Sequence, residues 1–182
     1  MNRIKNILIS LLLVSFAGIG FAQQSISVKT ITDKQHPRIL LLNGEERLIE
    51  QSIASNPVWA KMHQTILTEC DRMIGLPPIE RIQIGRRLLD KSREALRRIF
   101  QLSYSYRMTG QEKYFARCEK EMLAISNFSD WNPSHFLDVA EMTMAVAIGY
   151  DWLYPKLSEQ SRKTIREAIV SKGLNQSLDP KY

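Results

Sequence analysis

The chain has 182 residues, enough for one domain with a sizeable core or at most two small domains. Its formal net charge at pH 7 is +6, a mild excess that does not suggest a nucleic-acid-binding protein, where basic residues gather on one face. Eight Gly, seven Pro and no low-complexity run exclude disordered and fibrous classes, and two Cys are too few for a disulfide scaffold. The charge suits a folded protein that meets acidic ligands.

Residues 1–22 have the pattern of a secretory signal peptide. Arg3 and Lys5 form the positive start, residues 7–16 form the apolar centre, and residues 20–22 (Gly-Phe-Ala) form the cleavage site. The alternative is a membrane anchor, but the apolar run is short for a spanning helix and ends in small residues. No later apolar stretch is long enough to span a membrane. We therefore predict a secreted or periplasmic mature protein that is free of the membrane after cleavage.

Capping and stop residues divide most of the remaining chain into helices, after a polar, extended lead-in over residues 23–35. Asn43, Asn56 and Ser158 are the expected N-terminal caps, and Gly110 ends a helix in the left-handed conformation. The predicted helices cover residues 43–55, 56–74, 90–109, 111–126, 136–154 and 159–172. Between the second and third helices we expect a loop with a helical turn.

The helix predicted over residues 136–154 is apolar around its whole circumference, and such a helix is buried on all sides. Its small residues allow neighbouring helices to approach closely: Ala140, Ala145, Ala147 and Gly149. A simple four-helix bundle needs no helix of this kind, whereas a double ring of inner and outer helices does. The sequence therefore predicts an all-α fold of successive helical hairpins with one helix inside.

Two cysteines lie on apolar faces of predicted helices, Cys70 on one and Cys118 on another. An oxidising compartment would allow them to pair. Buried free thiols are the simpler interpretation, because free Cys behaves as a small hydrophobic residue.

The entry to the apolar helix carries four polar side chains: Asn132, His135, Asp138 and Glu141. Successive three-residue steps turn by about 60°, so the last three residues span an arc of roughly 120°. A carboxylate among apolar neighbours must be paired or bound to a ligand. One interpretation is that both acids pair with Arg residues of adjacent helices while His135 caps the helix. The other is a ligand-binding site.

Several kinds of catalytic site are not expected. His135 and Asp138 have a usable spacing for a metal, but no second His or Cys pair lies nearby. No Ser stands in a Gly-flanked elbow, and no Gly-rich phosphate loop is present. We predict neither a metal nor a cofactor.

The aromatic run over residues 150–154 (Tyr-Asp-Trp-Leu-Tyr) suits either carbohydrate stacking or core packing. We favour core packing for Trp152. The basic pairs at residues 86–87 and 97–98 are expected on solvated helix faces, where they could attract a polyanion.

Three segments resemble the N-terminal part of the heparinase II/III-like and oligoalginate lyase group of polysaccharide lyases. They are residues 36–40 (His-Pro-Arg-Ile-Leu), residues 132–142 around the polar cluster, and residues 147–154 (Ala-Ile-Gly-Tyr-Asp-Trp-Leu-Tyr). The resemblance covers about residues 36–182. It implies an incomplete (α/α) toroid, followed in the family by β-sandwich domains.

The resemblance also implies exported degradation of uronic-acid polysaccharides, of alginate or glycosaminoglycan type, by β-elimination. In the family an Asn with a His neutralises the uronate, and a Tyr removes the C5 proton. Those motifs follow residues equivalent to 173–175 by a few tens of positions. We therefore interpret residues 36–182 as a truncated toroid region and assign no catalytic residue.

The residues carried over from the family are His135 and Glu141, with Asn132 and Asp138 as weaker candidates. Their implied role is to bind a uronate or sugar hydroxyls of an acidic polysaccharide.

Two other functions remain as alternatives. A helical-repeat scaffold of the tetratricopeptide type would explain the hairpins, although no 34-residue period recurs. An (α/α)-toroid glycoside hydrolase would need a pair of acid/base carboxylates. Asp138, Glu141 and Asp151 are available for that pair, but their spacing singles out none.

Overall fold

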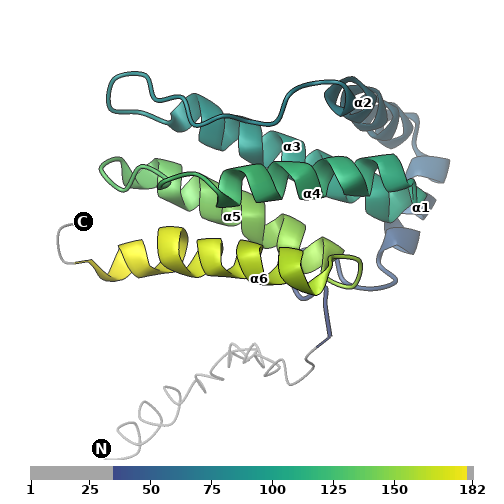
Figure 1. Cartoon of the computed structure of the whole chain (residues 1–182). Coiled ribbons are helices and arrows are strands. Elements are labelled where there is room, and N and C mark those ends of the chain that lie inside the picture. The colour runs from purple at the N-terminus through teal and green to yellow at the C-terminus, as the bar shows by residue number, and fades with distance from the viewer. Residues whose placement is uncertain (1–34, 180–182) are drawn as a thin grey trace, which may run out of the picture. The chain divides into compact units, whose positions relative to one another are not determined.

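Six α-helices account for most of residues 35–179, the part of the chain that the computed structural model describes (Figure 1). They are α1 (Glu46–Ser55), α2 (Pro57–Ile74), α3 (Leu89–Thr109), α4 (Glu112–Ser126), α5 (Phe136–Leu153) and α6 (Glu159–Ala168). The chain continues from α6 through a π-helical turn, η1 (Ile169–Gly173), and a 3-10 turn, η2 (Leu174–Leu178). No strand occurs within residues 35–179, so the predicted all-α class is confirmed. The predicted signal peptide and nearly all of the lead-in lie outside these residues.

Most helix boundaries follow from the predicted capping residues. The Asn56 side chain accepts a hydrogen bond from the backbone N–H of Val58 at 2.9 Å, and Ser158 accepts one from Ser161 at 3.0 Å. Gly110 has a φ of 67°, the left-handed conformation expected at a helix end. The loop before α3 differs from the prediction, because it holds an isolated antiparallel bridge between Ile84 and Arg87 instead of a helical turn.

The prediction that Asn43 caps the first helix is wrong. Helix α1 begins at Glu46, and its N-cap position is occupied by Glu45. The carboxylates of Glu45 and Glu46 accept hydrogen bonds from backbone N–H groups of the turn before α1. A cap at Asn43 would accept from the N–H of Glu45 or Glu46, but the Glu45 N–H donates to the Leu42 carbonyl at 3.2 Å. The Asn43 amide donates instead to the carbonyl of His36 at 3.4 Å.

The helices form hairpins that are arranged in two layers. Consecutive helices pair as α1 with α2, α3 with α4, and α5 with α6. Helix α3 packs against α5 in one layer, while α4 packs against both α2 and α6 in the other. As Figure 1 shows, α3 and α5 run in one direction and α4 and α6 in the opposite one.

Close packing of α5 depends on Gly149. A Cβ atom at this position would lie 2.5 Å from Cγ2 of Ile99 in α3 and 2.6 Å from Sδ of Met122 in α4. Ala145 is fully buried on the same helix. The predicted close approach through small residues is therefore confirmed for Gly149 and Ala145, but Ala140 is exposed and Ala147 is half-buried.

The prediction that α5 is buried on all sides is wrong for the described part of the chain. Leu137 is 48% exposed and Met144 52% exposed, and Ala140 between them is also exposed. Farther along the helix, Ile148 on the same side is covered by Leu41. The residues before α1 thus cover the second half of this side, and no described residue covers the first half.

The segment before α1 is bound to the end of α5. Asp151 is 2.6 Å from Nδ1 of His36 and accepts hydrogen bonds from the backbone N–H groups of Arg38 and Ile39 at 2.7 and 3.0 Å. The indole N–H of Trp152 donates to the Ile39 carbonyl at 2.9 Å. Trp152 is only 6% exposed, so the prediction of core packing is confirmed. Two of the three resembling segments therefore hold each other in place.

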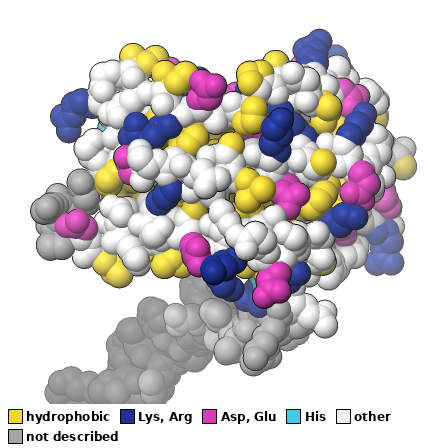
Figure 2. Space-filling model, viewed as in Figure 1, with side chains coloured by type: hydrophobic (Ala, Val, Ile, Leu, Met, Phe, Trp, Pro, Cys, Tyr) yellow, Lys and Arg dark blue, Asp and Glu magenta, His cyan; other side chains and the backbone are white. Residues whose placement is uncertain are grey.

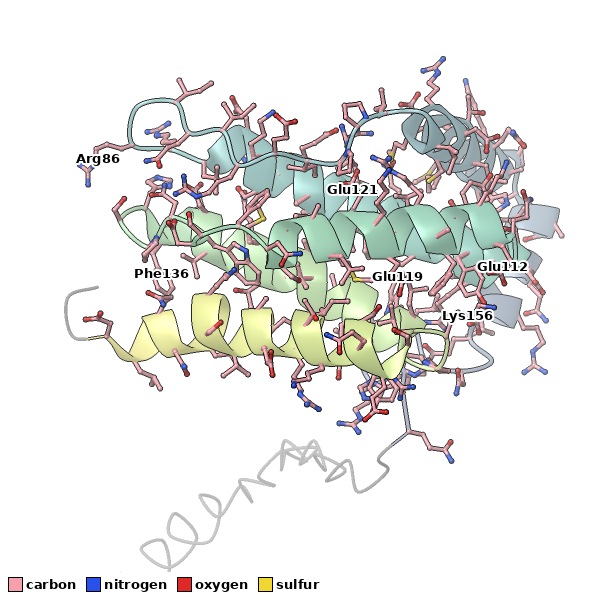
Figure 3. All side chains as sticks on the ribbon, in the orientation of Figure 1. Arg86, Glu112, Glu119, Glu121, Phe136 and Lys156 are labelled. Carbon is pink, nitrogen blue, oxygen red and sulfur yellow. The ribbon has the colours of Figure 1, made fainter. Side chains whose placement is uncertain are left out.

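The prediction that both Arg97 and Arg98 lie on a solvated face is half wrong. Arg97 is exposed and pairs with Glu94, whereas the Arg98 side chain is only 12% exposed. Arg98 is 2.7 Å from the buried carboxylate of Glu121, which also pairs with Arg117. Figure 3 shows Glu121 between α4 and the loop before α3, and that loop donates the Ile79 N–H to it at 2.9 Å. A buried charge is tolerated here because every oxygen has a partner.

Cys70 and Cys118 are both fully buried free thiols, as the simpler interpretation predicted. Burial raises the pKa of each thiol, most strongly for Cys118. None of the described helices is long and apolar enough to cross a membrane.

Candidate functional site

The four predicted site residues gather where the chain enters α5. Before this helix, Trp131 is fully buried and its indole N–H donates to the Ile125 carbonyl at 3.2 Å. Asn132 follows with a φ of 60°, a left-handed conformation that Asn adopts more readily than most residues. Its carbonyl accepts from the His135 N–H at 2.9 Å. The buried indole of Trp131 and the left-handed conformation of Asn132 thus set the direction in which the chain enters α5.

Asn132 and Asp138 are the buried half of the cluster, at 3% and 0% exposure. The Asn132 amide donates to Asp138 at 2.7 Å and to the Arg86 carbonyl at 2.8 Å. The same Asp138 oxygen accepts from the backbone N–H of Leu88 at 2.7 Å. These bonds join the start of α5 to the loop before α3, and they leave both side chains hidden from solvent.

His135 lies at the border of the cluster, with 28% of its side chain exposed. It occupies the N-cap position of α5 but makes no capping hydrogen bond, so the expected capping role is wrong. Its Nδ1 atom lies 3.3 Å from Oδ2 of Asp138. Nδ1 of His135 and Oδ1 of Asp138 are buried without a hydrogen-bond partner among the described residues. Nδ1 of His135 and the Asp138 carboxylate therefore face each other in the buried part of the cluster.

Glu141 lies nearer the surface, with 18% of its side chain exposed. It accepts a hydrogen bond from the Ser92 hydroxyl at 2.7 Å and lies 3.4 Å from Nε of Arg93. Arg93 belongs to α3 and is 61% exposed. The predicted pairing with an Arg of an adjacent helix is therefore confirmed for Glu141, but not for Asp138, whose partners are an amide and a backbone N–H.

Basic side chains surround this end of the bundle. Arg86 and Arg87 are exposed as predicted, although they lie in the loop before α3 and not on a helix. Figure 3 places Arg86 and Phe136 at the same end of the bundle, with Arg86 pointing away from it. Arg93 is the basic side chain at this end that contacts Glu141.

A second ion pair fixes the loop beside the cluster. Arg81 lies 2.7 Å from Asp130, whose carboxylate also accepts from the backbone N–H of Asn132 at 2.7 Å. Burial alone would raise the pKa of Asp130, but the bonds from Arg81 and Asn132 outweigh it and lower that pKa below its ordinary value. Asp130 is therefore an ionised support for the turn that holds Asn132.

The arrangement suits recognition better than acid/base chemistry. Asp138 and Asp151 both bind backbone N–H groups in buried positions, which leaves Glu141 as the one partly exposed member of the three candidate carboxylates. Inverting and retaining hydrolases both need a facing pair. Within residues 35–179, no group of three or more His, Cys, Asp or Glu residues could hold a metal ion.

Ser92, Arg93, Arg81 and Asp130 were not among the predicted site residues. Ser92 and Arg93 lie about 50 positions in sequence from Glu141, and Arg81 lies as far from Asp130, so no local spacing links these pairs. The sequence matches no family model, and a search of curated proteins finds no match.

Proposed function

We propose that this chain forms the first helical hairpins of an (α/α) toroid in an exported protein that binds an uronic-acid polysaccharide. The expected relatives are polysaccharide lyases of the heparinase II/III-like and oligoalginate lyase group. The observation that carries the proposal is the entry to α5, where partly exposed Glu141 lies beside the exposed cation of Arg93 and where His135 is also partly exposed. No residue of the described chain is assigned to the proton transfer of β-elimination.

The exposed side of α5 supports the toroid. Leu137, Ala140 and Met144 recur at three- and four-residue steps and so share one side of the helix. Gly149 packs on α3 from a different side of α5. In a closed ring an inner helix has a neighbour on each flank, so a further inner helix would cover Leu137 and Met144 as α3 covers Gly149.

The charges at the entry support an acidic ligand. A guanidinium can bind a carboxylate through two parallel hydrogen bonds, whereas the one ion-pair contact of Arg93 among the described residues is a long one, to Glu141 at 3.4 Å. The carboxylate of a uronate can bind the Arg93 guanidinium, while Glu141 and its Ser92 partner can form hydrogen bonds with sugar hydroxyls. This arrangement places both the positive charge and a hydrogen-bond acceptor at one rim.

Binding of a defined oligouronate by the chain from residue 23 onward would test the proposal. We expect a tetramer of mannuronate to bind more tightly than neutral maltotetraose in calorimetry, without formation of unsaturated products. Arg93→Gln should weaken binding about threefold to tenfold, because one exposed charge contact contributes modestly. Arg72→Gln is the matched control, since Arg72 is exposed and pairs with Glu69 on α2. Equal affinity for neutral and acidic sugars, or equal effects of the two variants, would overturn the proposal.

A further inference from the structure

A polar hollow of about 720 Å³ lies at the other end of α5, where the chain turns into α6. Three basic side chains line it: Arg162, Lys163 and Arg166. Tyr154 and the polar residues Glu159 and Gln160 complete its wall. None of these residues belongs to the cluster at the entry to α5.

The three cations lack ion-pair partners within the described chain, although acidic residues lie near them in sequence. Glu159 precedes Arg162 by three residues and Lys163 by four, spacings at which helical ion pairs form. No carboxylate of the described residues lies within 4.0 Å of any of the three cations, whereas Arg97 and Arg98 both pair with Glu94 at the same spacings. The hollow therefore has three cations against the single carboxylate of Glu159, and it keeps an excess of positive charge.

Arg162 is held in place without a carboxylate partner among the described residues. Its Nε donates to the Leu157 carbonyl at 3.1 Å, and its guanidinium lies 4.7 Å from the centre of the Tyr154 ring. Tyr154 is itself stacked on His36, with ring centres 3.9 Å apart, and His36 is fixed by Asp151. A positioned guanidinium loses less conformational entropy when it binds an anion.

Tyr154, which lines the hollow, and its neighbour Tyr150 are already in contact with protein groups. Tyr154 contacts His36 and Arg162, and Tyr150 meets both His36 and Tyr154 edge to face. Single-stranded nucleic acids need free aromatic faces on which bases stack, and these rings provide none. The open, polar wall likewise does not suit an apolar ligand. The three cations suit an anionic ligand, and the carboxylate or sulfate groups of a saccharide have this chemistry.

We infer that this hollow is a second binding site for an anionic saccharide, in which Arg162, Lys163 and Arg166 bind its acidic groups. The inference rests on the proposed function, because it assigns the site to the same uronic-acid polysaccharide. On the face seen in Figure 2, basic, acidic and apolar side chains are intermixed and no continuous basic band runs across it. Binding of an acidic polysaccharide would then depend on local clusters of basic side chains and not on one extended positively charged surface.

Amide NMR titration of the chain from residue 23 onward with the mannuronate tetramer would test the inference. We expect amides of residues 158–167 to shift, and Lys163→Gln with Arg166→Gln to weaken that site about fivefold to tenfold. The matched control is Arg47→Gln with Lys61→Gln, which removes the same charge from exposed positions of α1 and α2. A sulfated tetrasaccharide, maltotetraose and a single-stranded oligonucleotide of equal charge complete the set of ligands.

The outcomes separate this inference from the proposed function. Shifts confined to residues near Arg93 and Glu141 would overturn the second site and leave the proposed function intact. Shifts confined to α6 would support the second site and count against the entry to α5. Tighter binding of the oligonucleotide than of both acidic saccharides, or an equal loss in the control variant, would overturn the saccharide assignment. A stronger response to the sulfated ligand than to the uronate would identify sulfate as the preferred group.

Discussion

The carboxylate of Asp138 accepts a hydrogen bond from the backbone N–H of Leu88 at 2.7 Å and thereby ties the start of α5 to the start of α3. The first N–H groups of a helix have no partner within it, and here a side chain from another helix supplies one. The bond divides the polar cluster into two parts. Asn132 and Asp138 support the fold, whereas His135 and Glu141 reach solvent.

Replacement of Asp138 should therefore destabilise the protein strongly. Asp138→Ala leaves the Leu88 N–H and the Asn132 amide without their carboxylate partner, and we expect a loss of about 2–4 kcal/mol in the free energy of unfolding. Glu141→Gln, which keeps a partner for Ser92, should cost less than about 1 kcal/mol. Urea denaturation of both variants measures the difference, and equal losses would contradict the division of the cluster.

Glu121 should be even less replaceable. Glu121→Ala leaves the Arg98 and Arg117 side chains in a buried position without their anion, and we expect a loss of about 3–5 kcal/mol. Combining Glu121→Ala with Arg98→Met should cost less than the sum of the single changes, because one uncompensated charge is removed. A thermodynamic double-mutant cycle tests this, and simple additivity would show that the two side chains are not coupled. Glu94→Ala, at the exposed end of the same network, is the control.

Gly149→Ala tests the contact between the layers. The added methyl would approach Ile99 and Met122 to about 2.5 Å, so we expect a loss of about 1–3 kcal/mol as the core shifts. Gly75→Ala is a matched control, because Gly75 has a φ of −85° and no atom within 4 Å of the added group. Melting temperatures of the two variants give the comparison. A neutral Gly149→Ala would mean that α5 packs less tightly than described.

Asp130 should make stability depend on pH at the acidic end. Its folded pKa lies below the ordinary value, so its contribution is complete above the unfolded pKa of about 3.9 and is lost as pH falls through the folded pKa. Asp130→Asn should therefore lower stability at pH 7 by less than about 1 kcal/mol, since the side chain is 43% exposed. The difference from the native protein should shrink below about pH 4. A difference that is constant with pH would exclude this linkage.

The two thiols should be inaccessible in the folded protein. Burial of Cys70 and Cys118 raises the pKa of both, so we expect their reaction with a disulfide reagent to be slower than in denaturant by about a hundredfold or more. Two thiols per chain should be released on unfolding. Detection of none would indicate a disulfide, and rapid reaction before unfolding would contradict their burial.

Local patterns predicted the helices well and tertiary partners poorly. Asn56, Gly110 and Ser158 act within their own turns, and their roles could be read from the sequence. Asn43 had the same local pattern, yet the Glu45 N–H donates to the Leu42 carbonyl and the helix begins only at Glu46. Capping preference is a local property, and it fails where the turn before a helix already uses the backbone N–H that the cap would bind.

The candidate site was predicted in composition but not in geometry. The sequence identifies His135, Asp138 and Glu141 as unusual because they are polar and enter an apolar helix. It does not reveal that Asp138 binds the backbone of Leu88, because backbone donors leave no signature in the residue types. Glu121 had one readable clue, Arg117 at four-residue spacing, but its bonds to Arg98 and Ile79 depend on how the hairpins meet.

The contact between Asp151 and residues 36–39 also sets an order of assembly. The partners are more than 110 residues apart in sequence, so the first described segment has no binding site until α5 exists. The α3–α4 hairpin, in contrast, closes through a turn at Gly110 and needs only its own residues. Because closing a long loop is slow relative to forming local contacts, we expect the hairpins to form first and residues 36–39 to dock last.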